Sequence, residues 1–293
     1  MKASPSRPIL VSANLARLLV GALLVLVALP LLGSGPRAQG VEIPNFWDPK
    51  ARFERPDLTG LRPVRFLVDD EFPPLHFTGF DGVPTGFSVE LARAACERLA
   101  ITCTVQVRRF DTLLDSLAER GGDVVAAAIP TTASLRERFA VTNPYFKIPA
   151  RFVVRKDSEV PEPRGRTLAG RTVAVARGTA HEAFLKLLAP SAELRDFDDL
   201  GAAEAALRSG DVDYLFGDGL SLALWLGGPA GNTCCGFAGG PFLENRFFGE
   251  GIGFIVRRDD EILRRALDHA LQRLWDEGRY AELYLRFFPV SPF

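Results

Sequence analysis

Strand-like and helix-like segments alternate along this chain, and this alternation limits its fold more than any other feature. The helix expected at residues 88–100 repeats apolar residues at helical spacing, with charged residues on its other side. Strands that alternate with helices predict mostly parallel sheets covered on both faces. The first series of strands and helices is expected at residues 64–68, 88–100, 103–107, 112–119 and 124–129.

A second series begins after a polar, proline-containing connector at residues 156–168. Its strands and helices are expected at residues 172–176, 180–188, 202–208, 213–216 and 220–226. The tail adds a strand at residues 252–256, an amphipathic helix at about 260–276 and a short helix that ends at Phe288.

Two series separated by a connector predict an α/β protein with two lobes. Lobe 1 is expected at residues 64–150 and 252–293, and lobe 2 at residues 151–251. The chain then crosses twice between the lobes, and the glycines at residues 251–253 suit a hinge that absorbs backbone rotation. We therefore expect two mixed, mostly parallel sheets joined by a two-strand hinge.

Residues 1–38 have the pattern of a secretory signal peptide. Three basic residues precede an apolar run at residues 18–29, and small residues lead to Ala38. A transmembrane anchor is the alternative, but a span needs about 20 apolar residues. Cleavage near Ala38 predicts a periplasmic protein that begins with an irregular extension at residues 39–63. No cysteine lies near the cleavage point, so no lipid anchor is expected.

The charge and the motifs of the mature chain exclude several function classes. Loss of residues 1–38 removes four basic and no acidic side chains, so the formal charge changes from −1 to −5 (31 basic against 36 acidic). An acidic chain does not suit a nucleic-acid backbone. The histidines His76, His181 and His269 lack the spacing of a metal site, and no phosphate-binding or dinucleotide-binding motif occurs. We expect a monomer with no metal, no cofactor and no nucleic-acid partner.

Export changes how the four cysteines are interpreted, because an oxidising compartment favours disulfides. Cys96 and Cys103 lie at the end of an expected helix and the start of an expected strand. A short disulfide between them is predicted, with two free thiols as the alternative. Cys234 and Cys235 are adjacent, and their bonding state stays open at this point.

The candidate binding residues follow the ends of the expected strands. Open α/β sheets bind ligands beyond the carboxyl ends of their strands. Those positions are residues 69–72, 129–132, 177–180 and 217–218. They supply an aromatic ring, hydroxyl groups, a helix N-terminus and carboxylates, a chemistry that suits a small zwitterion or anion.

Several separated motifs resemble one known family. They are DDEFPPLHF, GFSVELARA, DVVAAAIPTTASLRERFAVTNPYF, GRTVAVARGTAHEAFL, GDVDYLFGD, RFFGEGIGFIVRRDD and LWDEGRYAELYLRFFP. In this order, they resemble the family-three extracellular solute-binding proteins, the periplasmic receptors for polar amino acids in ABC uptake systems. The resemblance implies a type II periplasmic-binding-protein fold, an amino-acid-like or carboxylate ligand between two lobes, and an ABC permease as partner. The spacing of Cys96 and Cys103 also resembles a disulfide in the histidine-binding branch.

The resemblance implies a role for particular residues. Phe72 matches the aromatic residue that covers the ligand, and Asp69 an acidic residue near the ligand side chain. Thr179 matches the position whose backbone N–H receives the ligand carboxylate, a role that a helix N-terminus suits because its N–H groups are free. Asp218 matches the carboxylate that pairs with the ligand ammonium. Two further ligand-binding positions are expected in the first lobe, Ala128 and Thr132.

The chain departs from the family at two first-lobe positions. The family usually has an arginine three residues after a threonine, which holds the ligand carboxylate, but Leu135 stands there and Arg136 follows. Pro130 takes a position where the family often has a serine, and proline has neither a hydroxyl nor an N–H. Arg136, or else Arg138, is the expected substitute for the arginine. Both departures affect the residues that, in the family, bind the carboxylate and the ammonium of an α-amino acid.

Simpler structural roles and other functions remain as alternatives. Asp218 and Thr179 also suit helix N-caps, Phe72 suits a core position, and Arg136 a solvated surface. An enzyme on this scaffold, similar to the cyclohexadienyl dehydratases, is the main rival function, with Asp69, Glu71 or His181 as the acid. A third possibility is a ligand-sensing partner of a membrane receptor.

Overall fold

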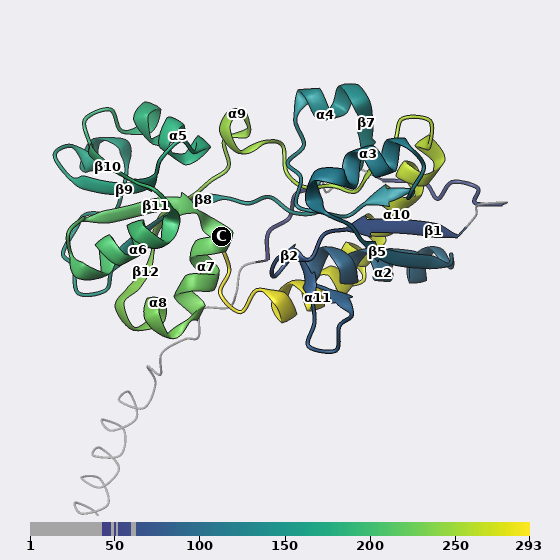
Figure 1. Ribbon diagram of the computed structural model, residues 1–293, viewed down its shortest axis with the longest axis horizontal. Helices are drawn as coiled ribbons and strands as arrows, with labels where there is room; N and C mark the ends of the chain where they lie inside the picture. Colours follow the sequence, from purple (N-terminus) through teal and green to yellow (C-terminus); the bar gives the residue numbers. More distant parts are fainter. Residues whose placement is uncertain (1–42, 48–49, 51, 60–62) are drawn as a thin grey trace, which may run out of the picture. The chain divides into compact units, whose positions relative to one another are not determined.

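The computed structural model describes residues 43–47, 50, 52–59 and 63–293 (Figure 1). The expected signal peptide at residues 1–38 lies outside this range. Within the described residues, no helix combines the length and the apolar character that a membrane span requires. The described residues before 60 form neither helix nor strand, and Trp47 among them packs against Trp275 and Tyr280, with ring centroids 5.3 and 5.2 Å apart.

The first sheet has five strands in the order β5-β1-β6-β13-β7. Strand β1 pairs in parallel with β5 and β6, whereas β13 is antiparallel to β6 and β7. We call this sheet and its helices the first lobe. Its elements are β1 (Val64–Val68), α2 (Phe87–Leu99), β5 (Cys103–Val107), a 3-10 turn (Phe110–Thr112), α3 (Leu113–Ala118), β6 (Val124–Val125), α4 (Ala133–Arg138), β7 (Phe139–Val141), β13 (Ile255–Arg257), α10 (Glu261–Asp276) and α11 (Arg279–Phe287).

The second sheet has five strands in the order β10-β9-β11-β8-β12. Strand β9 pairs in parallel with β10 and β11, and β8 is antiparallel to β11 and β12. We call this sheet and its helices the second lobe. Its elements are β8 (Ala150–Arg155), a 3-10 turn (Gly165–Leu168), β9 (Thr172–Ala176), α5 (Ala180–Leu188), β10 (Glu193–Phe197), α6 (Leu200–Ser209), β11 (Tyr214–Asp218), α7 (Gly219–Gly227), α8 (Pro229–Cys234) and β12 (Cys235–Phe242). Helix α9 (Asn245–Phe248) lies on the segment between β12 and β13.

The expected architecture, two mixed and mostly parallel sheets, is confirmed. In each sheet one strand runs against the other four, and this is the strand that the chain enters after a crossing, β8 or β13. Ala150 at the start of β8 pairs with Asp218 at the carboxyl end of β11. A strand that starts at the carboxyl ends of its neighbours must run in the opposite direction, which explains the reversal.

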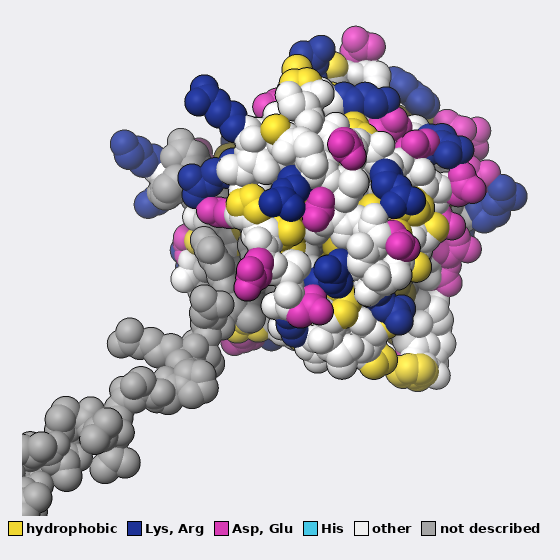
Figure 2. All heavy atoms as spheres, turned by 90° about the vertical axis from the view of Figure 1, so that its left-hand side faces the viewer, with side chains coloured by type: hydrophobic (Ala, Val, Ile, Leu, Met, Phe, Trp, Pro, Cys, Tyr) yellow, Lys and Arg dark blue, Asp and Glu magenta, His cyan; other side chains and the backbone are white. Residues whose placement is uncertain are grey.

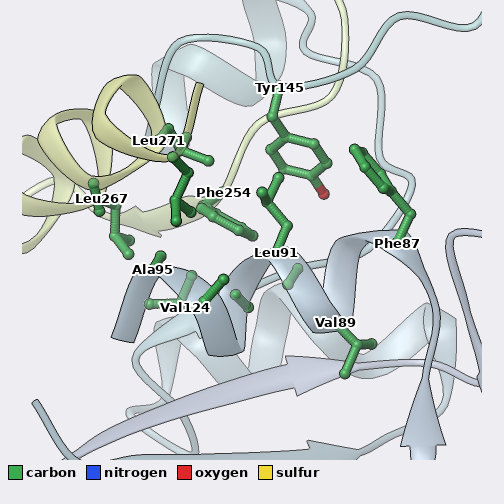
Figure 3. Packing of buried hydrophobic residues seen from close by; sticks show 14 of the residues in the cluster. Phe87, Val89, Leu91, Ala95, Val124, Tyr145, Phe254, Leu267 and Leu271 are labelled. Atoms are coloured by element: carbon green, nitrogen blue, oxygen red, sulfur yellow. The ribbon is translucent and has the colours of Figure 1, made fainter. Parts of the chain in front are cut away.

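Successive side chains along a strand point to opposite faces of the sheet, and in the first sheet a buried core forms on each face. Phe66 and Val68 of β1 belong to a buried cluster with α2 and α10, whereas Leu67 points to the opposite face, where α3 packs. Figure 3 shows Leu91 of α2 close to Phe254 in the larger cluster. The same division recurs in the second sheet, where α5 covers one face and α6 with α7 covers the other.

Two disulfides are present, and one of them was predicted. Cys96 at the end of α2 is bonded to Cys103 at the start of β5, as the sequence indicated. Cys234 and Cys235, which the sequence left open, are also bonded to each other. No free cysteine occurs among the described residues.

The two crossing segments are tied together by backbone hydrogen bonds. The N–H of Ile252 donates to the Phe146 carbonyl at 2.7 Å, and the N–H of Thr131 donates to the Gly251 carbonyl at 2.8 Å. Gly251 has φ of +118°, and a Cβ there would lie 2.8 Å from Cβ of Pro144. Only glycine fits this backbone, so the crossing requires it.

A small antiparallel sheet follows β1 and shapes the start of α2. It contains β2 (Glu71–Phe72), β3 (His76–Thr78) and β4 (Pro84–Thr85) in the order β2-β3-β4.

On the face shown in Figure 2, basic and acidic side chains are interspersed, and no large patch of one charge sign is present there.

Candidate ligand-binding cleft

One cleft of about 610 Å³ is lined by residues of both lobes and of the α9 segment. The first lobe contributes Pro130, Thr131 and Thr132, and the second lobe contributes Ala180, His181 and Asp218. Pockets for small molecules usually have volumes of about 300–1,000 Å³. The cleft therefore has the size for a ligand such as an amino acid.

The first turn of α5 forms one part of the second-lobe wall. Thr179 is the N-cap of this helix, and its Oγ1 accepts a hydrogen bond from the Glu182 N–H at 3.2 Å and donates to the Ala176 carbonyl at 2.8 Å. The Glu182 carboxylate accepts a hydrogen bond from the Gly178 N–H at 2.7 Å. Within the described residues, the N–H of Ala180 has no hydrogen-bond partner. It remains available to an anion at the cleft.

Asp218 forms another part of the same wall and serves two roles. It is the N-cap of α7, because its Oδ1 accepts a hydrogen bond from the Ser221 N–H at 2.7 Å. Among the described residues, its other oxygen, Oδ2, has no hydrogen-bond partner. The cap alternative and the binding alternative are thus compatible, since one oxygen caps the helix and the second is free.

His181 supplies an aromatic, uncharged part of the wall. Its ring stacks on Phe248, with centroids 5.1 Å apart, and meets the Phe216 ring edge-on at 6.1 Å. Burial lowers the pKa of His181 and outweighs the neighbouring Asp218 carboxylate, which raises it. The ring is therefore neutral at pH 7 and does not cancel the charge of Asp218.

The first-lobe wall offers fewer free polar groups. Thr132 lines the cleft as the N-cap of α4, and its Oγ1 accepts a hydrogen bond from the Leu135 N–H at 3.2 Å. The N–H of Thr131 donates to Gly251, as described above, and Pro130 has no N–H. The N–H of Ala133, which also lines the cleft, has no hydrogen-bond partner among the described residues, so this edge keeps a free donor as α5 does, but it places no charged side chain in the cleft.

Arg136, the expected substitute for the family arginine, is paired with Glu250, a carboxylate that itself lines the cleft. The Nε and Nη2 of Arg136 donate to Oε2 of Glu250 at 3.0 and 2.8 Å, and Arg136 does not line the cleft. Leu135, at the family's arginine position, is buried against Leu113 and Leu117 of α3. Arg138 lies 3.4 Å from Asp115. A carboxylate-binding role for Arg136 or Arg138 stays a prediction.

The remaining first-lobe candidates gather around a buried histidine. The Nδ1 of His76 lies 3.1 Å from both the carbonyl oxygen and Oδ1 of Asp69, and the Ala128 N–H donates to its Nε2 at 2.9 Å. Because Nε2 accepts, the proton of the neutral ring is on Nδ1. Phe72 stacks on His76 at 5.8 Å and packs against the first-lobe core. Asp69 lines a different hollow, together with Glu71 and residues 107–111.

The structure adds cleft residues that the sequence argument did not single out. Helix α9 places Asn245, Arg246, Phe247 and Phe248 along the cleft. The only local sequence signal for these residues was an arginine followed by two phenylalanines, just before the glycines of the second crossing. Their position beside Asp218 depends on the path between the lobes, which local periodicity does not reveal.

Residues 64–290 match the model of the bacterial extracellular solute-binding proteins, family 3. The chain belongs to this family. The match covers both sheets and both crossings. No group of three or more metal-ligating side chains that could hold a metal ion is found among the described residues of this solute-binding protein.

Relatives and solved structures agree with the family assignment. The ABC transporter arginine-binding protein 1 of Escherichia coli K12 is 27% identical over 77% of this chain and 90% of its own length. The histidine-binding periplasmic protein of the same strain is 27% identical over 77% of this chain and 87% of its own. The second substrate-binding domain of GlnP from Lactococcus lactis, in an open conformation, shares the fold with a TM-score of 0.68, at 18% identity and coverage of 78% and 96%.

Proposed function

We propose that this solute-binding protein captures a small amino acid or a related carboxylate in the cleft and delivers it to an ABC permease. One observation carries the proposal. A free carboxylate oxygen of Asp218 and the free N–H of Ala180 line the same cleft. The first pairs with an ammonium group and the second receives a carboxylate, so together they match the two ends of an amino acid.

The relatives narrow the ligand class in the same direction. Proteins named for arginine and histidine binding match this chain over most of their length. We infer that the ligand carries an ammonium group, held by Asp218, while Thr132 contributes its hydroxyl from the first lobe. In a closed, dry cleft, a charge-assisted hydrogen bond is stronger than in water.

The proposal includes a closing motion of the two lobes around the ligand. A ligand that contacts both lobes favours the closed form only by its differential affinity for that form. We propose that lobe 1 comprises residues 64–150 and 252–293 and lobe 2 residues 151–251, with Gly251 in the hinge. Export to the periplasm with cleavage near Ala38, and a monomeric state, complete the proposal.

An enzyme on the same scaffold has less support. Its candidate acids, Asp69 and Glu71, line one hollow, whereas His181 lines the cleft. Asp69 is in addition the partner of the buried His76. A ligand-sensing partner of a membrane receptor would use the same cleft, and only the identity of the membrane partner distinguishes it from a transport component.

A thermal-shift screen of the mature protein tests the proposal. The panel contains the common L-amino acids, their deaminated analogues and small carboxylates. A ligand that binds only the folded protein stabilises it and so raises the melting temperature. At a ligand concentration of a hundred times the Kd, the stabilisation is about 2.7 kcal/mol. We expect a shift with an amino acid and no turnover. A panel in which no amino acid shifts the melting temperature contradicts the proposal, and turnover of prephenate or arogenate supports the enzyme.

A further inference from the structure

The cleft lacks the cation that usually holds a ligand carboxylate, because Leu135 occupies that position and Arg136 is bound to Glu250. The free backbone N–H groups at the start of α5 carry no full charge, whereas a guanidinium is charged and offers two parallel donors to one carboxylate. A ligand carboxylate in this cleft therefore needs a cation from another element. Arg246 is the arginine that lines the cleft.

Two phenylalanines fix the backbone that carries Arg246. Phe247 and Phe248 pack their rings on Phe184 of α5, with centroids 5.4 and 5.2 Å apart, and Phe248 also stacks on His181. The Glu244 side chain caps α9 by accepting a hydrogen bond from the Arg246 N–H at 3.3 Å. The short helix α9 is thus held against the second lobe, and the side chain between these anchors borders the cleft.

The guanidinium of Arg246 is uncommitted, in contrast to that of Arg136. Within the described residues it forms no ion pair, and its Cζ lies over the Phe247 ring, 5.6 Å from the ring centroid. Its side chain is exposed, so it keeps the rotamer freedom to follow a ligand. Asp218 lines the same cleft with the opposite charge. A zwitterion can meet a cation and an anion there at once.

We infer that Arg246 is the carboxylate-recognising residue of this protein and replaces the arginine that the first lobe lacks. The inference rests on the proposed function, since it needs an amino acid in the cleft. Arg246 lies on the segment between the lobes. A carboxylate held by it draws the α9 segment, rather than α4, toward the ligand.

Pairs of acid and carboxamide probes test this role. We would titrate wild type and Arg246→Gln with L-arginine and L-argininamide, and with L-histidine and L-histidinamide. A charge-assisted hydrogen bond to a carboxylate contributes enough that its loss weakens acid binding about tenfold to a hundredfold. The amide has no negative charge, so its affinity should change less than about threefold. Arg246→Lys should keep part of the preference for the acid.

A matched control separates this effect from a general loss of positive charge. Arg286 is also exposed and lies over the ring of the next residue, Phe287, at 5.2 Å, but it does not line the cleft. Arg286→Gln should bind all probes as wild type does. An Arg246→Gln protein that keeps the full preference for acid over amide overturns the inference and leaves the proposed function intact. Wild type that binds neither acid refutes the arginine-like or histidine-like ligand, and the inference with it.

Discussion

The two edges of the cleft differ in what they leave free for a ligand, although both follow the carboxyl ends of parallel strands. On the second-lobe edge, Asp218 keeps a free oxygen and α5 keeps a free N–H. On the first-lobe edge, the Ala128 N–H is bound to His76, and the position of the family arginine is a buried leucine, Leu135.

We infer from this difference that recognition of the charged groups of the ligand has moved from the first lobe to the second. The first-lobe edge places no charged side chain in the cleft, since Leu135 is buried and Arg136 is paired with Glu250. The second lobe and the α9 segment supply charge. Substitutions on the second-lobe edge should therefore reduce the affinity for the ligand, whereas substitutions on the first-lobe edge should reduce the stability of the protein.

The largest effect should come from Asp218→Asn. Asparagine keeps the N-cap of α7 but removes the negative charge that pairs with the ligand ammonium. Breaking a buried charged pair costs about 3 kcal/mol, or about a hundredfold in affinity. Isothermal titration with the amino acid that most stabilises wild type measures the loss.

The control for Asp218 is a second aspartate cap in the same lobe. Asp199 caps α6 by accepting a hydrogen bond from the Ala202 N–H at 2.8 Å, and it does not line the cleft. Asp199→Asn should leave affinity unchanged. If both substitutions weaken binding equally, the effect of Asp218 comes from helix capping and the second-lobe assignment fails.

Leu135→Ala should separate stability from affinity on the first-lobe edge. Leu135 is buried in the cluster around α3, and removal of a buried leucine side chain costs about 2 to 3 kcal/mol of unfolding free energy. Denaturant unfolding measures this loss, and titration of the folded variant should give the wild-type Kd within about twofold. A large loss of affinity would mean that this edge still contributes to recognition.

Glu204→Gln should stabilise the protein in a pH-dependent way. Burial, and then the Asp199 carboxylate, raise the pKa of Glu204 to about 7. Below its unfolded value of 4.5 the group is protonated in both states and costs nothing; the penalty accumulates as the pH rises from 4.5 to about 7 and stays constant above that. After allowance for solvent screening, we expect a gain of about 1 kcal/mol at pH 8 and none at pH 4, measured by thermal unfolding.

An exposed glutamate provides the comparison for Glu204. Glu97 lies on the surface of α2 in the first lobe. Glu97→Gln should not reproduce the rise in melting temperature between pH 4 and pH 8. Equal gains for both variants would point to overall charge rather than to the local environment of Glu204.

The smallest effect should come from Arg136→Gln. The Arg136–Glu250 ion pair is solvent-exposed, and such pairs contribute about 0–1 kcal/mol to stability. Because Arg136 does not line the cleft, affinity for an amino acid should change less than about threefold. A tenfold or larger loss by titration would restore Arg136 as the carboxylate-binding arginine and displace Arg246.

Local patterns in the sequence predicted six of the ten strands in the two five-stranded sheets, together with the longer helices. The run from Val64 to Val68 and the helical spacing before Cys96 correspond to β1 and α2, and the spacing of Cys96 and Cys103 corresponds to a disulfide. Strands β7, β8, β10 and β12 were missed, and β10 (Glu193–Phe197) escaped because it is an edge strand with mostly charged, partly exposed residues. The strand expected at residues 124–129 is shorter, since the chain leaves the sheet after Val125.

The site could be predicted only where a strand end determines it. Thr132 and Asp218 follow this rule, and both line the cleft. Arg246 could not be found this way, because its position depends on the return path between the lobes. The pairing of Arg136 with Glu250 joins residues 114 positions apart, a contact that no local spacing encodes.

The most direct test is a thermodynamic cycle that removes the ammonium group from the ligand and the negative charge of Asp218 from the protein, separately and together. Wild type and Asp218→Asn are each titrated with the amino acid that most stabilises wild type and with its deaminated analogue. The second-lobe account predicts that wild type prefers the amino acid by about a hundredfold and that the preference falls below about threefold in the variant. An equal preference in both proteins would show that the ammonium is bound elsewhere and would contradict the account.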